Sequence, residues 1–336
     1  EDGIRDTNSG LVGSEMCIRD RLGTRRDTVT PAPLVNIRDV ANAGTYAALA
    51  PLAWSLPESQ LPAAARAIAR LLSAAAPSGG RHQAYRKTVL GDRLDAGRAA
   101  AVQAEILTNV TLERLYRLRC YRPGGWQPAC RIEGGEHIEA ALAEGRGALL
   151  WVMPFRYSDL ISKIALHRNG YDVSHLSRFN HPGSNTRLGC AFVNPVRTSI
   201  EGRHLGERLV IGRDARIDGR PTLEVLSDRL AANRLVTITV GTGGRRTLAV
   251  PFLDGEFRVA TGPAHLALTT GAPILPVFTI AEAPGDFTVT IGAPLDAGAA
   301  TDDAGRIDGL IRDFAGRLEP FAERWPDQFP WVRFAD

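Results

Sequence analysis

Two side chains able to move a proton follow segments that we expect to form strands. Asp159 comes shortly after the apolar run at residues 148–153, and His181 comes shortly after the segment at residues 171–177. Because the turns at the carboxyl ends of neighbouring parallel strands lie at one edge of a sheet, we expect this carboxylate and this imidazole to lie close together. An imidazole beside a carboxylate can act as a general base towards a hydroxyl group. The alternative is that His181 is a loop histidine with no role.

The elements that must position these side chains alternate between strand and helix from residue 131 onward. The run at residues 148–153 is too short to cross a membrane and is typical of a strand buried on both faces. A helical pattern at residues 159–168 separates it from the strand expected at 171–177, so the unit is βαβ with parallel strands. His175 lies inside this second strand, where we expect a buried imidazole with a structural role. Further strands are expected at residues 235–240, 246–252, 272–280 and, as a short edge strand, 286–291.

This alternation predicts an α/β fold with a mainly parallel central sheet, arranged as a three-layer sandwich. The first part of the chain does not show this alternation of strands and helices. Residues 1–22 resemble a cloning or sequencing scar, and we expect them to be disordered or loosely attached. Residues 23–130 are expected to be helical and to pack on an α/β core at residues 131–336, without forming a domain of their own. Asp95 is expected to begin the longest of these helices.

An alanine- and leucine-rich segment within this helical region shows one apolar stripe. The stripe consists of Leu61, Ala65, Ile68, Leu71 and Leu72. Such a stripe fits a helix that lies on a membrane surface, and it fits equally well a helix that faces the core of the same domain. Both interpretations are open on the sequence alone.

Composition argues against several classes of function. The chain has 336 residues, is 44% hydrophobic and 23% charged, and carries a net charge of +3, which is ordinary for a globular protein. This charge is too small to indicate nucleic-acid binding but suits contact with anionic lipid. The four cysteines have no metal-ligand spacing, which favours free thiols in a reducing compartment and no bound metal. We expect no transmembrane helix and no signal peptide.

Four segments of the chain are similar, in type and order, to segments of one known family. They are GGEHI and GRGALL at residues 134–138 and 145–150, VPF at 250–252, TGPA with GAPILPV at 261–264 and 271–277, and RWPDQFPW at 324–331. On these segments the chain resembles the lysophospholipid acyltransferase superfamily. It is most similar to the branch that acylates lipid A precursors, the lauroyl/myristoyl acyltransferases.

This resemblance implies a fold of the glycerophosphate-acyltransferase type and an acyl transfer reaction. In the family, a histidine followed by a carboxylate (HxxxxD/E) just after the first strand takes the proton of an acceptor hydroxyl. The hydroxyl attacks an acyl thioester of acyl carrier protein or coenzyme A, while hydrogen-bond donors stabilise the oxyanion. The implied acceptor is a lipid-like hydroxyl or amine, and no cofactor is expected, the acyl thioester being a co-substrate. The implied location is cytoplasmic, with peripheral contact with the inner membrane left open.

The chain departs from the family's motif at one position. The HxxxxE motif aligns with the sequence PFRYSD, which keeps the carboxylate as Asp159 but has Pro154 at the position of the histidine. His167 and Asp172 have the motif's spacing, but they lie at a helix end and a strand start, at the wrong edge of the sheet. Two interpretations remain. Either His181 supplies the base, or the chain has lost acyl transfer and binds a lipid or an acyl chain.

Six further residues are candidates for binding the substrate, because they lie in the same turns, in the connection that follows, or at a helix start: Arg156, Ser158, Arg178, Arg197, Thr261 and Gly262. Arg197 resembles an arginine that family members use near the phosphate of the acceptor. The alternative is a surface arginine beside what looks like an insertion at residues 198–220. The helix start at Thr261 and Gly262 offers backbone N–H groups to an anion, and simple helix capping is the alternative there.

Overall fold

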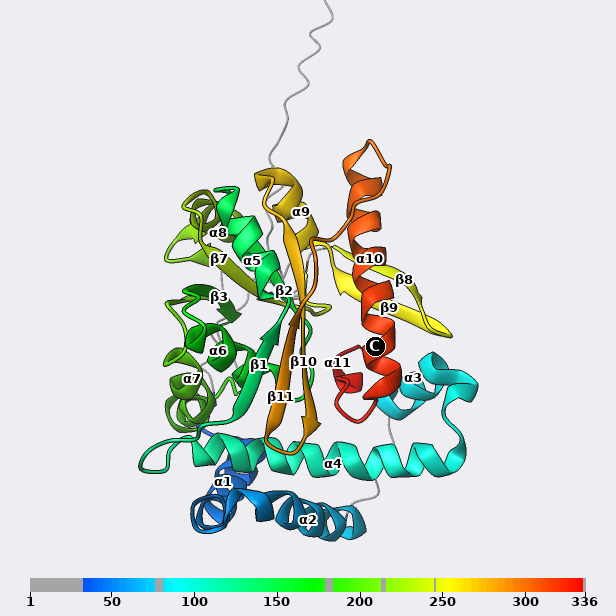
Figure 1. Ribbon diagram of the computed structural model, residues 1–336. Coiled ribbons are helices and arrows are strands. Elements are labelled where there is room, and N and C mark those ends of the chain that lie inside the picture. Colours follow the sequence, from blue (N-terminus) through cyan, green and yellow to red (C-terminus); the bar gives the residue numbers. More distant parts are fainter. Residues whose placement is uncertain (1–32, 76–80, 179–183, 213–215, 245, 335–336) are drawn as a thin grey trace, which may run out of the picture.

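The computed structural model describes residues 33–75, 81–178, 184–212, 216–244 and 246–334. Within these ranges a seven-stranded sheet forms the centre of the molecule, with the strand order β1-β11-β10-β2-β7-β3-β4 (Figure 1). Neighbouring strands are parallel, except that β10 and β11 are antiparallel. The predicted α/β class and the mainly parallel sheet are therefore confirmed. The strands are β1 (Ala129–Glu133), β2 (Ala148–Val152), β3 (Val173–Arg178), β4 (Glu207–Ile211), β7 (Leu235–Thr239), β10 (Ile274–Ala283) and β11 (Asp286–Ile291).

The order of these strands differs from the sequence-based expectation in three places. β2 and β3 are parallel but are not neighbours, because β7 lies between them and pairs with both. β11 is not an edge strand, since it lies between β1 and β10. The segment that resembled an insertion contains β4, which pairs with β3 and belongs to the main sheet. Hydrophobic periodicity identifies a strand but not its place in a sheet, which depends on contacts between distant segments.

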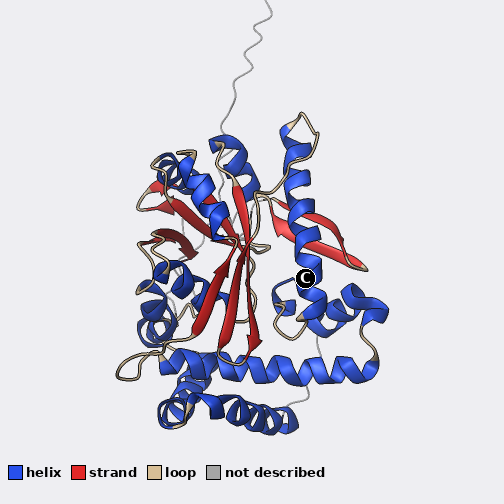
Figure 2. Ribbon diagram, in the orientation of Figure 1, coloured by secondary structure: helices blue, strands red, loops and turns tan. Residues whose placement is uncertain are grey.

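Figure 2 shows helices on both sides of the strands. Side chains that alternate along β2 divide the interior in the same way, since Leu149 and Trp151 belong to one core and Leu150 and Val152 to the other. The first core also contains apolar residues of α8, α9 and α10, and the second contains those of α4, α5 and α6. These helices are α4 (Ala96–Arg119), α5 (Gly135–Ala143), α6 (Ser158–Arg168), α8 (Thr222–Ala231), α9 (Gly262–Thr270) and α10 (Asp303–Arg324).

β8 (Thr247–Phe252) and β9 (Gly255–Ala260) form an antiparallel hairpin that is separate from the main sheet. The strand expected at residues 246–252 is thus present but lies outside that sheet. The hairpin packs on α10, with the rings of Phe257 and Phe314 stacked at a centroid distance of 6.4 Å. The hairpin and α10 therefore form one wall over the first core.

The N-terminal helices α1 (Ile37–Ser55) and α2 (Leu61–Ala75) pack on the long α4 below the sheet in the orientation of Figure 1, whereas α3 (Arg81–Leu90) packs on β9 and the short C-terminal helix α11 (Trp331–Phe334). Asp95 caps α4 as predicted by accepting a hydrogen bond from the Arg98 N–H at 2.8 Å. Residues 1–22 lie outside the described ranges.

The apolar stripe of α2 divides into a buried and an exposed part. Leu61 and Ala65 are fully buried against the other N-terminal helices, whereas Leu71 is 73% exposed and Leu72 is 54% exposed. The core-facing interpretation therefore holds for the first half of α2. In the described part of the chain, no helix has both the length and the apolarity of a membrane span.

Gly147 fixes the entry of the chain into β2. Its φ angle is +63°, and a Cβ atom at this position would lie 2.5 Å from the carbonyl oxygen of Arg234 and 2.8 Å from that of Leu230. A residue with a side chain would meet both backbone strain and a clash with main-chain atoms. This glycine therefore holds the start of β2 close to the segment that leads into β7.

Candidate active site

A cavity of about 1300 Å³ lies at the carboxyl ends of β3 and β7, beside the first turns of α9 and α10. This is the edge of a parallel sheet at which ligands usually bind. Its lining includes apolar side chains from four strands and one helix: Trp151, Leu176, Ile211, Ile238 and Ile307. The cavity thus offers an apolar surface that an acyl chain could occupy.

Polar side chains line one part of this cavity. Asp159 and Lys163 come from α6, and His175 comes from β3. The same three side chains also line a small neighbouring cavity of about 10 Å³ between α6 and the sheet. These three side chains therefore lie at the boundary between the large cavity and the small one.

Asp159 lies in the first turn of α6, where the helix dipole favours a negative charge. Its Oδ2 accepts a hydrogen bond from Arg197 Nη2 at 3.1 Å and lies 3.7 Å from Arg333 Nη2, and its side chain is 15% exposed. Burial raises the pKa of Asp159, but Arg333 and Arg197 outweigh burial and hold the pKa below its ordinary value. The carboxylate is ionised at neutral pH and is a weak base.

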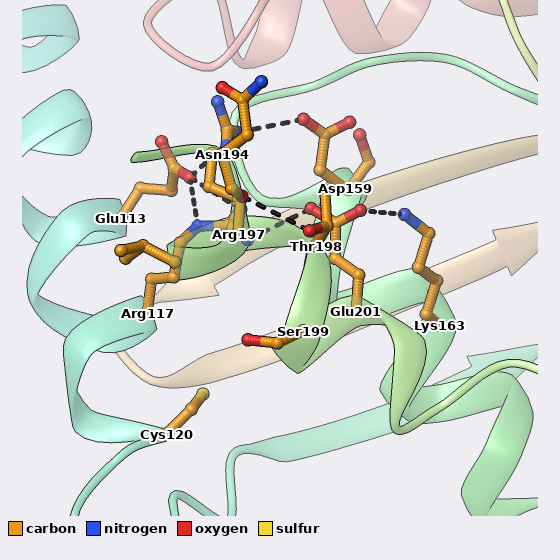
Figure 3. A network of polar contacts seen from close by, with 12 residues as sticks. Glu113, Arg117, Cys120, Asp159, Lys163, Asn194, Arg197, Thr198, Ser199 and Glu201 are labelled. Carbon is orange, nitrogen blue, oxygen red and sulfur yellow. Dashed lines mark hydrogen bonds and ion pairs between the residues drawn. The ribbon is translucent and has the colours of Figure 1, made fainter. Parts of the chain in front are cut away.

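A buried network of ion pairs surrounds this carboxylate and joins α4, α6 and α7 (Pro195–Gly202) (Figure 3). Glu201 lies 3.1 Å from Arg117 Nη1 and 2.7 Å from Lys163 Nζ, and none of these three side chains is more than 7% exposed. Oε1 of Glu113 lies 2.9 Å from Nη2 of Arg117 and 3.4 Å from Nη2 of Arg197. Arg333 of α11 (Trp331–Phe334) adds a fourth helix through its contact with Asp159. Because its members come from four helices, the network fixes the positions of these helices relative to one another.

Positive charge exceeds negative charge in this part of the described chain. The network has three carboxylates and four cations, and the guanidinium of Arg156 lies near them. Burial lowers the pKa of Arg156, and its Nε is buried without a hydrogen-bond partner among the described residues. A local surplus of positive charge favours the binding of an anionic group.

The candidate residues in the turn before α6 have different surroundings. Ser158 is 1% exposed, and its Oγ donates a hydrogen bond to the carbonyl oxygen of Phe155 at 2.8 Å. It lines the small cavity but not the large one. Arg156 and Arg197 lie in or beside the ion-pair network and do not line the large cavity. These three side chains thus belong to the ion-pair network or to the turn before α6, and none of them lines the large cavity.

The other candidates line the large cavity directly. Arg178 lines it and donates a long hydrogen bond of 3.4 Å to the carbonyl oxygen of Gly243. Thr261 and Gly262 line it at the start of α9, where no side-chain cap occupies the helix N-terminus. The N–H of Thr261 itself donates to the carbonyl oxygen of Arg246 at 3.1 Å. A guanidinium and a helix N-terminus at this end suit an anionic part of a substrate.

His181, the candidate base, lies outside the described residues. Sequence reasoning missed Lys163, which lies one helical turn after Asp159 and could have been found from that spacing. Glu113, Glu201 and Arg333 join the network from distant segments, and no local pattern indicates this. His167 and Asp172 do not approach the cavity, and Asp172 is paired with Arg234 instead. In the described ranges no cluster of three or more His, Cys, Asp or Glu side chains could hold a metal ion.

An α/β protein with a large apolar cavity at the carboxyl edge of its sheet has the arrangement of many ligand-binding enzymes. The chain belongs to the family of bacterial lipid A biosynthesis acyltransferases, whose model matches residues 39–333. It is also similar to the phosphatidylinositol mannoside acyltransferases of two strains of Mycobacterium tuberculosis, with 32% identity over 151 residues in each case. That similarity covers 44% of this chain and 43% of each relative, so less than half of the relatives' length is matched.

Proposed function

We propose that this protein transfers a fatty acyl group from an acyl thioester to a lipid-like hydroxyl or amine. The observation that carries the proposal is the apolar cavity of about 1300 Å³ with a polar, cationic part beside it. This volume exceeds the upper end, about 1000 Å³, of ordinary small-molecule sites, as a long chain together with an acceptor requires. Membership of a lipid acyltransferase family supports the same reaction class.

The proposal assigns the two parts of the cavity to two parts of the reactants. The acyl chain lies along the apolar strand residues, while Arg178 and the start of α9 at Thr261 and Gly262 bind an anionic group of the donor or the acceptor. The donor is a thioester of acyl carrier protein or of coenzyme A. Asp159 orients groups at the polar end through its two arginines. The proposed architecture is the three-layer sandwich of the glycerophosphate-acyltransferase type, with the helical N-terminal part in peripheral contact with a membrane surface.

The test is an assay of thioester consumption with lauroyl- and palmitoyl-coenzyme A, the corresponding acyl carrier protein thioesters, and a panel of lysophospholipid and glycolipid acceptors. Thiol release that depends on the acceptor, together with an acylated product detected by mass spectrometry, is the expected result. Ala304→Trp places a large ring at an exposed residue that lines the cavity and is expected to raise KM for the longer chain. Ala299→Trp, at an exposed alanine outside the cavity lining, is the matched control. Equal KM values for both variants would refute the assignment of the cavity to the acyl chain.

A second candidate function is that of a catalytically inactive homologue that binds lipids or acyl chains. Two observations favour it: Pro154 at the position proposed for the motif histidine, and an Asp159 carboxylate already paired with two arginines. This function predicts saturable binding of a fluorescent fatty acid without consumption of any thioester. Acceptor-dependent turnover in the same preparation would exclude it.

A further inference from the structure

A histidine of the central sheet lies where the two cavities meet. His175 is 7% exposed, lines both the large and the small cavity, and shares both linings with Asp159 and Lys163. His265 also lines the large cavity, but it belongs to α9 and does not line the small one. His175 is therefore the described histidine that lines both of these spaces together with the acidic residue of α6.

The imidazole of His175 is held by the neighbouring strand. Its Nδ1 lies 2.8 Å from Thr237 Oγ1, and the Cα atoms of these two residues are register partners in β3 and β7. In the tautomer in which Nδ1 donates to that hydroxyl, Nε2 carries the lone pair that a general base requires. A hydroxyl on a rigid central strand thus orients the ring, as a carboxylate orients the base in other acyl-transfer sites.

We infer that His175 is the base that removes the proton from the acceptor hydroxyl, in the place of an imidazole at the turn before α6. This inference rests on the proposed acyl transfer. Asp159 is poorly suited to the task because two arginines already bind its carboxylate, and Lys163 is paired with Glu201 at 2.7 Å. His175 has the chemistry and the cavity position that the reaction needs.

The resulting step is balanced in atoms and electrons. The acceptor oxygen attacks the carbonyl carbon of the acyl thioester while its proton passes to Nε2 of His175. The tetrahedral oxyanion then collapses, the C–S bond breaks, and the imidazolium gives the proton to the departing thiolate. The products are the acylated acceptor and a free thiol, and the imidazole is again neutral. Lys163 and Arg197 supply positive charge near this polar end.

The experiment compares three single substitutions, His175→Gln, His181→Gln and His167→Gln, in the full chain. General-base catalysis contributes about 100- to 10,000-fold, so His175→Gln is expected to lower kcat by about 100-fold or more while KM for the thioester changes little. His167→Gln is the matched control, because its ring packs against His204 away from the cavity and its loss should leave kcat unchanged. A large loss of kcat in His181→Gln with normal kcat in His175→Gln would overturn the inference.

A second variant separates a chemical role from a structural one. His175→Ala leaves space beside the cavity, and added free imidazole is expected to restore part of its kcat, which a merely structural residue would not allow. No rescue in a folded variant, judged by an unchanged melting temperature, would count against the inference. If the unmodified protein turns over no thioester with any acceptor, the proposed function itself fails. If it does turn thioesters over and His175→Gln is equally active, only the role of His175 fails.

Discussion

Replacement of Glu201 by glutamine tests the energetics of the buried ion-pair network. The Glu201 side chain is 2% exposed and joins Arg117 of α4 to Lys163 of α6. Glu201→Gln keeps the size of the side chain but removes its charge. Two buried cations then lose a partner, although Arg117 retains Glu113 at 2.9 Å. The cost therefore falls mainly on the ammonium group of Lys163.

The size of this cost follows from the burial of the partners. Removal of one member of a buried pair destabilises a protein by about 3–5 kcal/mol, because the other charge remains buried and uncompensated. Since Arg117 keeps one carboxylate, we expect a loss near the lower end, about 3 kcal/mol. An exposed pair contributes only about 0–1 kcal/mol. Glu224→Gln provides that comparison, because Glu224 of α8 is 55% exposed in its ion pair with Arg220, which precedes the helix.

Urea denaturation followed by circular dichroism measures the free energy of unfolding of both variants. The expected result is a much lower midpoint for Glu201→Gln than for Glu224→Gln, with similar slopes. The double variant Lys163→Met with Glu201→Leu is expected to recover much of the loss, because it leaves no unpaired ammonium at this place. Equal and small losses for Glu201→Gln and Glu224→Gln would refute the view that the network is desolvated.

Three further outcomes are expected. A residue other than glycine in a left-handed backbone conformation costs roughly 1–2 kcal/mol. Gly147→Ala should lower the free energy of unfolding, measured in urea, by more than this cost, because the added Cβ would also clash with main-chain oxygens. Gly170→Ala, with a φ of +80° but open space, should show only the backbone cost. Burial lowers the pKa of His204 from 6.5 to about 4, so between these pH values mainly the unfolded chain binds this proton, and stability decreases as the pH is lowered from 6.5 to 4. His204→Gln should lose less stability over that range, as measured by melting at a series of pH values. Asn36→Ala removes a side chain that accepts the Asp39 N–H at 2.8 Å, and should cost about 1 kcal/mol and speed hydrogen exchange at the start of α1.

Much of the fold can be predicted from hydrophobic periodicity and from turn residues. The apolar runs of β2, β7 and β10 and the capping aspartate of α4 lead to elements close to those observed. Strand order is not available from these signals. β7 reaches the space between β2 and β3 from a segment far along the chain, and β4 has an alternation too short and too charged to distinguish from a loop. Such pairings depend on long-range packing, not on local propensity.

The candidate site could be predicted only in part. Asp159, in the first turn of the helix after β2, and the start of α9 line the cavity, as expected from the general rule that ligands bind at the carboxyl edge of a parallel sheet. The ion-pair network could not be predicted, since Glu113, Asp159 and Glu201 are far apart in sequence and meet only when α4, α6 and α7 pack. From the sequence alone His175 is expected to be structural, because a histidine inside a strand is commonly buried, and its spacing gives no sign of the adjoining cavity.

The strand order affects the synthesis of the chain on the ribosome. In the described sheet β1 pairs only with β11, and β2 pairs with β7 and β10, all of which are made much later. Until the ribosome has passed Asp286, the nascent polypeptide therefore exposes strands whose permanent neighbours do not yet exist. Parallel pairing between such distant segments is slow, and unpaired apolar strands aggregate readily. Chaperone supply and translation speed in a host should consequently limit the yield of folded protein more than its final stability does.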